Sequence, residues 1–299
     1  LESLCLESDL NSCLFGGEFC CASYQPNSIS WDSYFTCKCD FFSHVSSVLA
    51  NVGSVTVANQ YCEFLSPRAE NLTEQAMALK DIYSTTGGDY WHNNSGWFVD
   101  DIDQCDWFGV SCGNTDYGRV THIDLGSNNL TGPFPSKAIS MMRGLQTLIL
   151  ANNSLSGVVD YNAFYSNKEL VHVDLSSNEL TGMAELLFSP HVEYLNLSHN
   201  NFDYINAMKS FHSALETLEY VDLSFNNIVQ DMKYIFGNIM PSGLVEVYLS
   251  DNGIFGTLPS PFPSLDRLTT LSIANNNMTG SLPDFASSLP ELRTLDLSN

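Results

Sequence analysis

A short pattern of apolar positions recurs throughout residues 120–299. The stretch LVHVDLSSNELTG, residues 170–182, shows it most clearly, because its residues have the spacing L-x-x-L-x-L-x-x-N-x-L with Asn178 as the fixed polar position. Six further copies are complete, and an eighth begins at Leu292 and stops one residue before its own asparagine. The fixed asparagines are 22 to 26 residues apart, a period typical of proteins built from stacked repeats. They are Asn128, Asn153, Asn178, Asn200, Asn226, Asn252 and Asn276.

Each copy predicts a short strand followed by a turn. In the third copy, Val173 and Leu175 are two residues apart, so their side chains lie on one face of the strand. His172 and Asp174 then face the opposite way. Asn178 follows in the turn, where its amide can bond backbone groups that the turn leaves unpaired. A single copy cannot bury its leucines, so we expect an α/β solenoid in which stacked copies share one core and one parallel sheet.

The segment before the repeats has helical spacing and a distinctive aromatic motif. Residues 72–86, LTEQAMALKDIYSTT, predict a helix with Thr73 as its N-cap. The stretches ALKDIYSTTGGDYWHNNSGW and CDWFGVSC closely resemble the N-terminal cap of plant-type extracellular leucine-rich repeat proteins, such as receptor-like ectodomains and secreted inhibitors of plants and algae. The resemblance covers roughly residues 70–299. It implies a right-handed superhelix with a concave parallel sheet, and a disulfide between Cys105 and Cys112.

The same resemblance predicts a second short strand in some repeats. Its signature, L-x-G-x-[IL]-P, follows the asparagine in the first, sixth and seventh copies as LTGPFP, IFGTLP and MTGSLP. Copies two to five depart from this signature. We expect helical structure in parts of them instead, as at Ile205–Leu215 and Met232–Ile239.

Residues 1–66 differ from the rest of the chain in composition. They hold seven of the nine cysteines, and Lys38 is their single basic residue. This concentration predicts a small disulfide-rich module made in an oxidising compartment, with one cysteine left free or paired to another chain. Zinc held by Cys20, Cys21, Cys37 and Cys39 is the alternative, although these cysteines lack the usual C-x2-C spacing. We therefore expect three segments: a cysteine-rich module, residues 1–66; a cap, residues 67–119; and the repeats, residues 120–299.

Charge and sequons bear on the compartment and the partners. The net charge of -23 argues against nucleic acid or an anionic membrane surface as partner. No run of 18 apolar residues exists, so we expect no membrane span within this chain. Because the chain stops inside a repeat, we expect it to be part of a longer protein.

Six Asn-x-Ser/Thr sequons fit an extracellular or cell-surface glycoprotein, although this composition would supply nearly as many by chance. They are Asn71, Asn93, Asn129, Asn152, Asn196 and Asn277.

The chain contains no motif that predicts catalysis. A zinc-protease helix, a phosphate-binding loop and a dinucleotide fingerprint are missing from the sequence. The pairs His122/Asp124 and His172/Asp174 occupy the same outward strand positions two repeats apart. That separation is about 10 Å, too far for both histidines to bind one metal ion. We therefore expect neither enzyme activity nor a cofactor or metal site.

The outward strand positions instead predict a binding surface. Solvent-facing aromatic side chains on a concave sheet are good anchors for a partner, although tyrosine also suits strands for its own sake. We predict a recognition or adhesion module that binds a protein, peptide or glycan, or another copy of itself. A structural subunit of an extracellular matrix, wall or filament, assembled through the cysteine-rich head, is the alternative. The candidate ligand-binding residues are His172, Tyr194, Tyr220, Phe225 and Tyr248.

Overall fold

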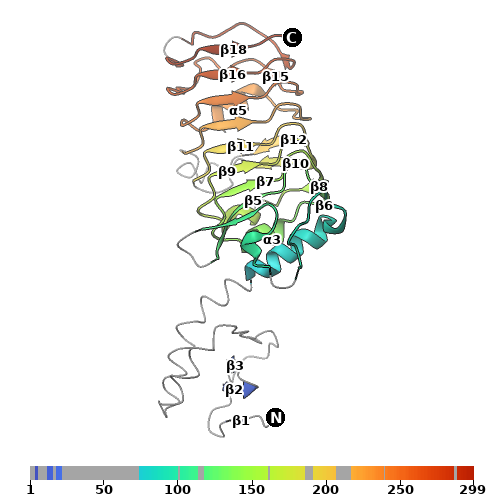
Figure 1. Cartoon of the computed structure of the whole chain (residues 1–299). Coiled ribbons are helices and arrows are strands. Elements are labelled where there is room, and N and C mark those ends of the chain that lie inside the picture. The colour runs from blue at the N-terminus through green and yellow to red at the C-terminus, as the bar shows by residue number, and fades with distance from the viewer. Residues whose placement is uncertain are drawn as a thin grey trace, which may run out of the picture. The chain divides into compact units, whose positions relative to one another are not determined.

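A computed structural model describes most of the chain from residue 74 onward (Figure 1). The chain divides into two compact units, Leu1–Thr73 and Glu74–Asn299. The described residues are 74–99, 102–113, 118–160, 162–185, 191–206, 217–238, 240–285 and 288–299, together with the backbone of three short strands in the first unit. The expected N-cap Thr73, the sequon Asn71 and the zinc alternative at the N-terminal cysteines lie outside the described side chains.

The described backbone of the first unit forms one antiparallel sheet. Its strands pair in the order β1, β2, β3. They are β1 (Leu4–Cys5), β2 (Ser12–Phe15) and β3 (Glu18–Cys21).

The second unit is built on a nine-stranded sheet. Eight strands are parallel, one from each copy of the repeat, and Figure 1 shows them stacked in chain order from β5 to β18. The predicted solenoid with a parallel sheet is therefore confirmed. The ninth strand, β4 (Val110–Cys112), belongs to the cap and pairs antiparallel with β5. The parallel strands are β5 (Val120–Asp124), β7 (Thr147–Ile149), β9 (His172–Asp174), β11 (Tyr194–Asn196), β13 (Tyr220–Asp222), β14 (Glu246–Tyr248), β16 (Thr270–Ser272) and β18 (Thr294–Asp296).

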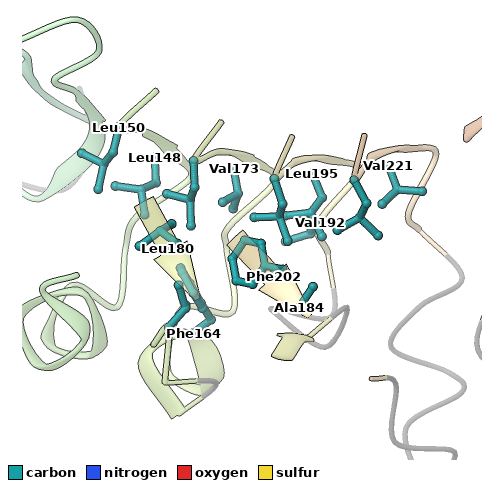
Figure 2. Close-up of a cluster of buried hydrophobic side chains, with 14 of the residues drawn as sticks. Leu148, Leu150, Phe164, Val173, Leu180, Ala184, Val192, Leu195, Phe202 and Val221 are labelled. Atoms are coloured by element: carbon teal, nitrogen blue, oxygen red, sulfur yellow. The ribbon is translucent and has the colours of Figure 1, made fainter. Parts of the chain in front are cut away.

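The middle residue of each three-residue parallel strand points into a shared core, as Ile123 of β5 does. Leu148, Val173, Leu195 and Val221 form a continuous line beneath the sheet (Figure 2), and all four are fully buried. Phe202, from the segment after β11, packs against this line from below. Because each repeat contributes one residue to the line, every repeat buries its apolar face only against its neighbours.

The asparagine after each strand ties its repeat to the one before it. The Asn178 Nδ2 group donates to the carbonyl oxygens of Leu175 and Ser176 in its own turn, both at 3.1 Å. It also donates to Leu150 of the preceding repeat at 3.0 Å, and Asn178 Oδ1 accepts from the Leu155 amide at 2.9 Å. Equivalent bonds are made by Asn153, Asn200, Asn226, Asn252 and Asn276.

A second set of strands runs along the side of the solenoid, in more repeats than the sequence predicted (Figure 1). The expectation that repeats two to four lack this strand, and that helix begins at Ile205, is wrong, because Ile205 lies in β12. Each of these strands pairs with its neighbours through backbone groups, so the proline of the signature is not required. One sheet holds β6 (Thr131–Pro133), β8 (Ser154–Val158), β10 (Glu179–Glu185) and β12 (Asn201–Asn206), and a second holds β15 (Phe255–Gly256) and β17 (Asn277–Met278).

Repeat five interrupts the lateral strands with a side chain. The buried Gln230 accepts from the Ile205 amide at 3.0 Å and donates to the Ile205 carbonyl at 3.2 Å, as a neighbouring strand would. The chain then forms α5 (Met232–Asn238), as the sequence predicted for this stretch. Two other helices, α3 (Ser136–Met141) and α4 (Asn162–Tyr165), lie in repeats one and two.

The cap closes the first repeat with aromatic side chains. Trp91, Trp97 and Trp107 are buried, with successive ring centroids 4.9 and 5.0 Å apart, and each indole N–H donates to a backbone carbonyl. Cys105 and Cys112 are joined by a disulfide. The helical elements of the cap are residues 74–85, η1 (Gly88–Tyr90) and η2 (Gln104–Asp106).

The cap also continues the hydrogen bonding of the repeats. Asn128 Oδ1 accepts from the Asn93 amide at 2.7 Å and Nδ2 donates to the Asn93 carbonyl at 2.9 Å. From the helix, the buried Gln75 accepts from the Val120 amide at 2.6 Å. Asn128 thus pairs both backbone groups of Asn93 in the cap, and Gln75 pairs the first amide of β5.

Replacing a ladder asparagine tests how much these bonds contribute to stability. Asn178→Ala leaves a buried donor and several carbonyls without partners, so the free energy of unfolding should fall by roughly 1–3 kcal/mol. Urea unfolding followed by circular dichroism measures the change. The matched control is Asn227→Ala at an exposed asparagine one residue after the ladder, which should change stability by less than about 0.5 kcal/mol. Equal losses for the two variants would contradict the ladder's role.

Candidate ligand-binding face

The register of the concave sheet brings the predicted aromatic residues together. His172, Tyr194, Tyr220 and Glu246 are direct partners on successive strands. Parallel strands lie about 4.8 Å apart, so residues that are 22 to 26 positions apart in the sequence become neighbours. The second outward position aligns Asp174, Asn196, Asp222 and Tyr248 in the same way.

Four of these side chains form a row of rings, which we call the aromatic column, and the first three of them are stacked. The ring centroids of His172 and Tyr194 are 4.1 Å apart with a 2° angle between the planes, and those of Tyr194 and Tyr220 are 4.3 Å apart at 8°. Tyr248 ends the column with its ring tilted by 45° at 5.6 Å from Tyr220. Each stacked ring covers the face of its neighbour, so the column presents mainly ring edges and hydroxyl groups to solvent.

Burial shifts the ionisation of the column toward neutral forms. Burial raises the pKa of Tyr194 and of Tyr220, and the nearby carboxylate charges act in the same direction. Burial, together with a 2.7 Å hydrogen bond from its hydroxyl to Glu246, raises the pKa of Tyr248 to about 12. Burial lowers the pKa of His172, and the Asp174 charge opposes this shift only partly. The column is therefore a set of neutral hydrogen-bonding groups beside acidic residues.

Asp174, Asn196 and Asp222 lie side by side next to the column, and we call them the acidic row. This row has a structural role that the sequence did not predict. One oxygen of Asp222 accepts from both the amide and the hydroxyl of Ser224, at 2.8 and 2.6 Å. Asn196 makes the same two contacts with Ser198, at 3.1 and 2.8 Å. These bonds hold the turn after the strand, and they explain why Asp or Asn followed by Ser recurs there.

The two histidine–aspartate pairs remain apart. Thr147 lies in register between His122 and His172, so the pairs are not neighbours. Within the described residues, no group of three or more His, Cys, Asp or Glu side chains is arranged to hold a metal ion.

A second aromatic pair lies just beyond the strands. Phe225 stacks on His199 with centroids 4.2 Å apart and an 8° angle between the rings, and we call these two residues the rim pair. Sequence analysis selected Phe225 but missed His199. Both residues directly precede a ladder asparagine, and they belong to neighbouring repeats. These equivalent positions in the sequence were the signal that would have predicted the contact.

Comparison with known proteins matches this architecture to one family. Family models described as leucine rich repeat match residues 143–202, 214–231 and 242–299. The repeats of this chain are leucine-rich repeats. Serine/threonine-protein kinase BRI1-like 1 and Receptor-like protein 41, both of Arabidopsis thaliana, are 30% and 32% identical to this chain over 154 and 147 residues. These matches cover 51% and 48% of the chain but only 13% and 16% of the two relatives. The resemblance to plant receptor-like proteins is therefore confirmed.

A solved structure extends the comparison to the fold. The leucine-rich repeat ectodomain of the Arabidopsis receptor kinase HAESA, in complex with an N-terminally extended IDA peptide hormone, is 29% identical with a TM-score of 0.62. The match covers 75% of this chain and 36% of the HAESA chain. No helix in the described part of the repeat protein is long and apolar enough to cross a bilayer.

The sequons of this chain differ in exposure. Asn129, Asn152 and Asn277 are exposed, and Asn93 is half-buried in the cap. Asn196 is half-buried on the concave face, where the aligned residues on either side are Asp174 and Asp222. The first three sites follow the concave strands, so glycans there would leave the aromatic column uncovered.

The ionisation of Tyr248 offers a test of the column's geometry. Glu246→Gln removes the negative charge but keeps an acceptor, so the pKa of Tyr248 should fall from about 12 toward its ordinary value of 10.0. Because the folded-state pKa is the raised one, this hydroxyl contributes stability below pH 10 that is lost as the pH rises toward 12. NMR titration of the labelled tyrosine Cζ carbons measures the shift, and Tyr248→Phe assigns the signal. An unchanged pKa in Glu246→Gln would refute the contact.

Proposed function

We propose that this chain is an extracellular or cell-surface recognition module that binds a peptide or protein segment across repeats three to six of its concave face. The observation that carries the proposal is the aromatic column, which joins side chains of successive repeats into one continuous surface. Tyrosines of this kind combine a large contact area with little loss of rotamer entropy on binding. The similarity to the peptide-bound HAESA ectodomain supports the same class of ligand.

The stacking favours a peptide over a glycan. A sugar ring packs its C–H groups against an open aromatic face, and the column covers most of its ring faces with neighbouring rings. The hydroxyls of Tyr194 and Tyr220 interact with each other and remain groups of both donor and acceptor type, which suits the alternating N–H and C=O groups of an extended backbone. Asp174 and Asp222 border the column, so a basic peptide would associate faster than an acidic one.

The structural-subunit alternative rests on other residues. It depends on disulfide pairing by the cysteines of residues 1–66, whose side chains lie outside the described part of the chain. The recognition role requires no catalysis. In a receptor like the longer relatives, the leucine-rich repeats of this chain would lie outside the cell.

A truncated tyrosine at the centre of the column tests the proposal. Peptides are first selected from a displayed random library on the wild-type protein, and their affinities for variants are then measured by calorimetry. Tyr220→Ala should weaken binding by about tenfold or more, the effect expected of a central aromatic anchor. Lys233→Ala, at an exposed residue of α5, serves as the control and should leave binding unchanged. Equal affinities for the two variants would refute binding at the concave face.

The state of Asn196 decides how that result is interpreted. A glycan on Asn196 would lie beside Tyr194 and cover the column, so the proposal expects this site to be unmodified. Peptide mapping of protein secreted from a eukaryotic host measures the occupancy of each sequon. Full occupancy at Asn196 would move the binding surface away from the column.

A further inference from the structure

We infer that the rim pair is a subsite for one arginine side chain of the bound peptide, held between the open face of Phe225 and the carboxylate of Asp251. This inference rests on the proposed function. The rim pair differs from the aromatic column in its backbone conformation.

The residue before each ladder asparagine has a left-handed backbone, with φ between 51° and 56°. Serine, asparagine and aspartate occupy this place in most repeats, and asparagine and aspartate in particular tolerate this conformation because their side chains bond locally. Histidine also adopts it more often than most residues, whereas a bulky phenylalanine is strained there. The rim row consists of Ser127, Asn152, Ser177, His199, Phe225, Asp251 and Asn275.

The fold does not require phenylalanine at this position. The Phe225 amide donates to the Ser250 carbonyl at 3.0 Å, and the Ser177 amide makes the same contact with Ser198 at 2.9 Å. A serine therefore supports the backbone equally well. The Phe225 side chain remains 48% exposed, so its burial does little to offset the strain. Strain that the packing does not compensate points to a role in binding.

The surroundings of the ring define what it would bind. His199 covers one face, and the opposite face is directed toward the next repeat, where Asp251 holds the equivalent position. An aspartate side chain is shorter than that of phenylalanine, so it can cover only part of this ring face. Asp251 is oriented by a 2.9 Å hydrogen bond from Asn275.

A guanidinium group fits this arrangement. It is planar, stacks on the negative face of an aromatic ring and donates paired hydrogen bonds to a carboxylate. No residue of the rim row is lysine or arginine, and the net charge of the chain is -23. A cation from a partner would therefore meet no lysine or arginine side chain in this row.

The test uses probes that do not depend on the library-selected peptides. Acetyl-Gly-Arg-Gly-amide and its neutral citrulline analogue are titrated into protein with labelled phenylalanine and histidine rings, and NMR shifts are recorded. The arginine peptide should shift the Phe225 and His199 signals, with an affinity two- to fivefold above that of the citrulline peptide. Phe225→Ser and Asp251→Asn should each abolish that difference. Equal binding of the two peptides to the wild type would overturn the inference.

Thermal unfolding separates a binding role from a structural one. Phe225→Ser places a common residue of the rim row in the left-handed position, so its unfolding temperature should be equal to or above that of the wild type. A clear decrease with unchanged peptide binding would show that Phe225 serves the fold and would overturn the inference. The matched control is Val229→Ser, at a 64% exposed apolar residue of the same repeat, which should leave the arginine preference intact.

The column variant keeps the two proposals distinct. Tyr220→Ala should leave the short arginine peptide's binding unchanged, while it weakens the library-selected peptides. If the selected peptides depend on Tyr220 but not on Phe225, the recognition function stands and the arginine subsite fails. If they depend on neither residue, both fail.

Discussion

The structure depends on the hydrogen bonds that each ladder asparagine makes with two successive repeats. A turn after a strand leaves several amides and carbonyls unpaired, and burying such groups without partners is costly. Asn178 satisfies carbonyls in its own turn and groups in the preceding repeat with one side chain. Because the same amide spans two repeats, it also sets their relative register. In the cap, Asn93 offers its own backbone to Asn128, so the constraint reaches the start of the solenoid.

Because the parallel strands are in register, residues at equivalent positions of successive repeats form one continuous surface. Once equivalent positions are aligned, a substitution at one position of the repeat faces the same position in the next repeat. His172, Tyr194 and Tyr220 thus become one stack, although each would be an unremarkable strand residue by itself. The neighbouring acidic row is used differently, because carboxylates such as Asp222 hold the turn that follows the strand. A leucine-rich repeat protein can therefore vary its outward residues while the inward ones preserve the fold.

The repeats also show where the fold accepts local departures from the pattern. Gln230 replaces a lateral strand by bonding both backbone groups of Ile205, so the edge of β12 is satisfied without a continuing sheet. Phe225 departs in the opposite sense, since it occupies a left-handed position without burying its ring. Gln230 keeps the backbone paired, whereas Phe225 leaves an aromatic face in solvent.

The periodic leucines and asparagines alone determined the strands, the shared core and the parallel sheet, because these follow from spacing and from the need to pair buried backbone groups. The CDWFGVSC motif indicated the cap by a different route, through its resemblance to the caps of known proteins. The lateral strands of repeats two to four, the reciprocal bonds of Gln230 and the contact between His199 and Phe225 were decided only by the tertiary structure. Each of these depends on which residue of the next repeat lies opposite, and a spacing of 22 to 26 residues becomes a contact only when the register is known.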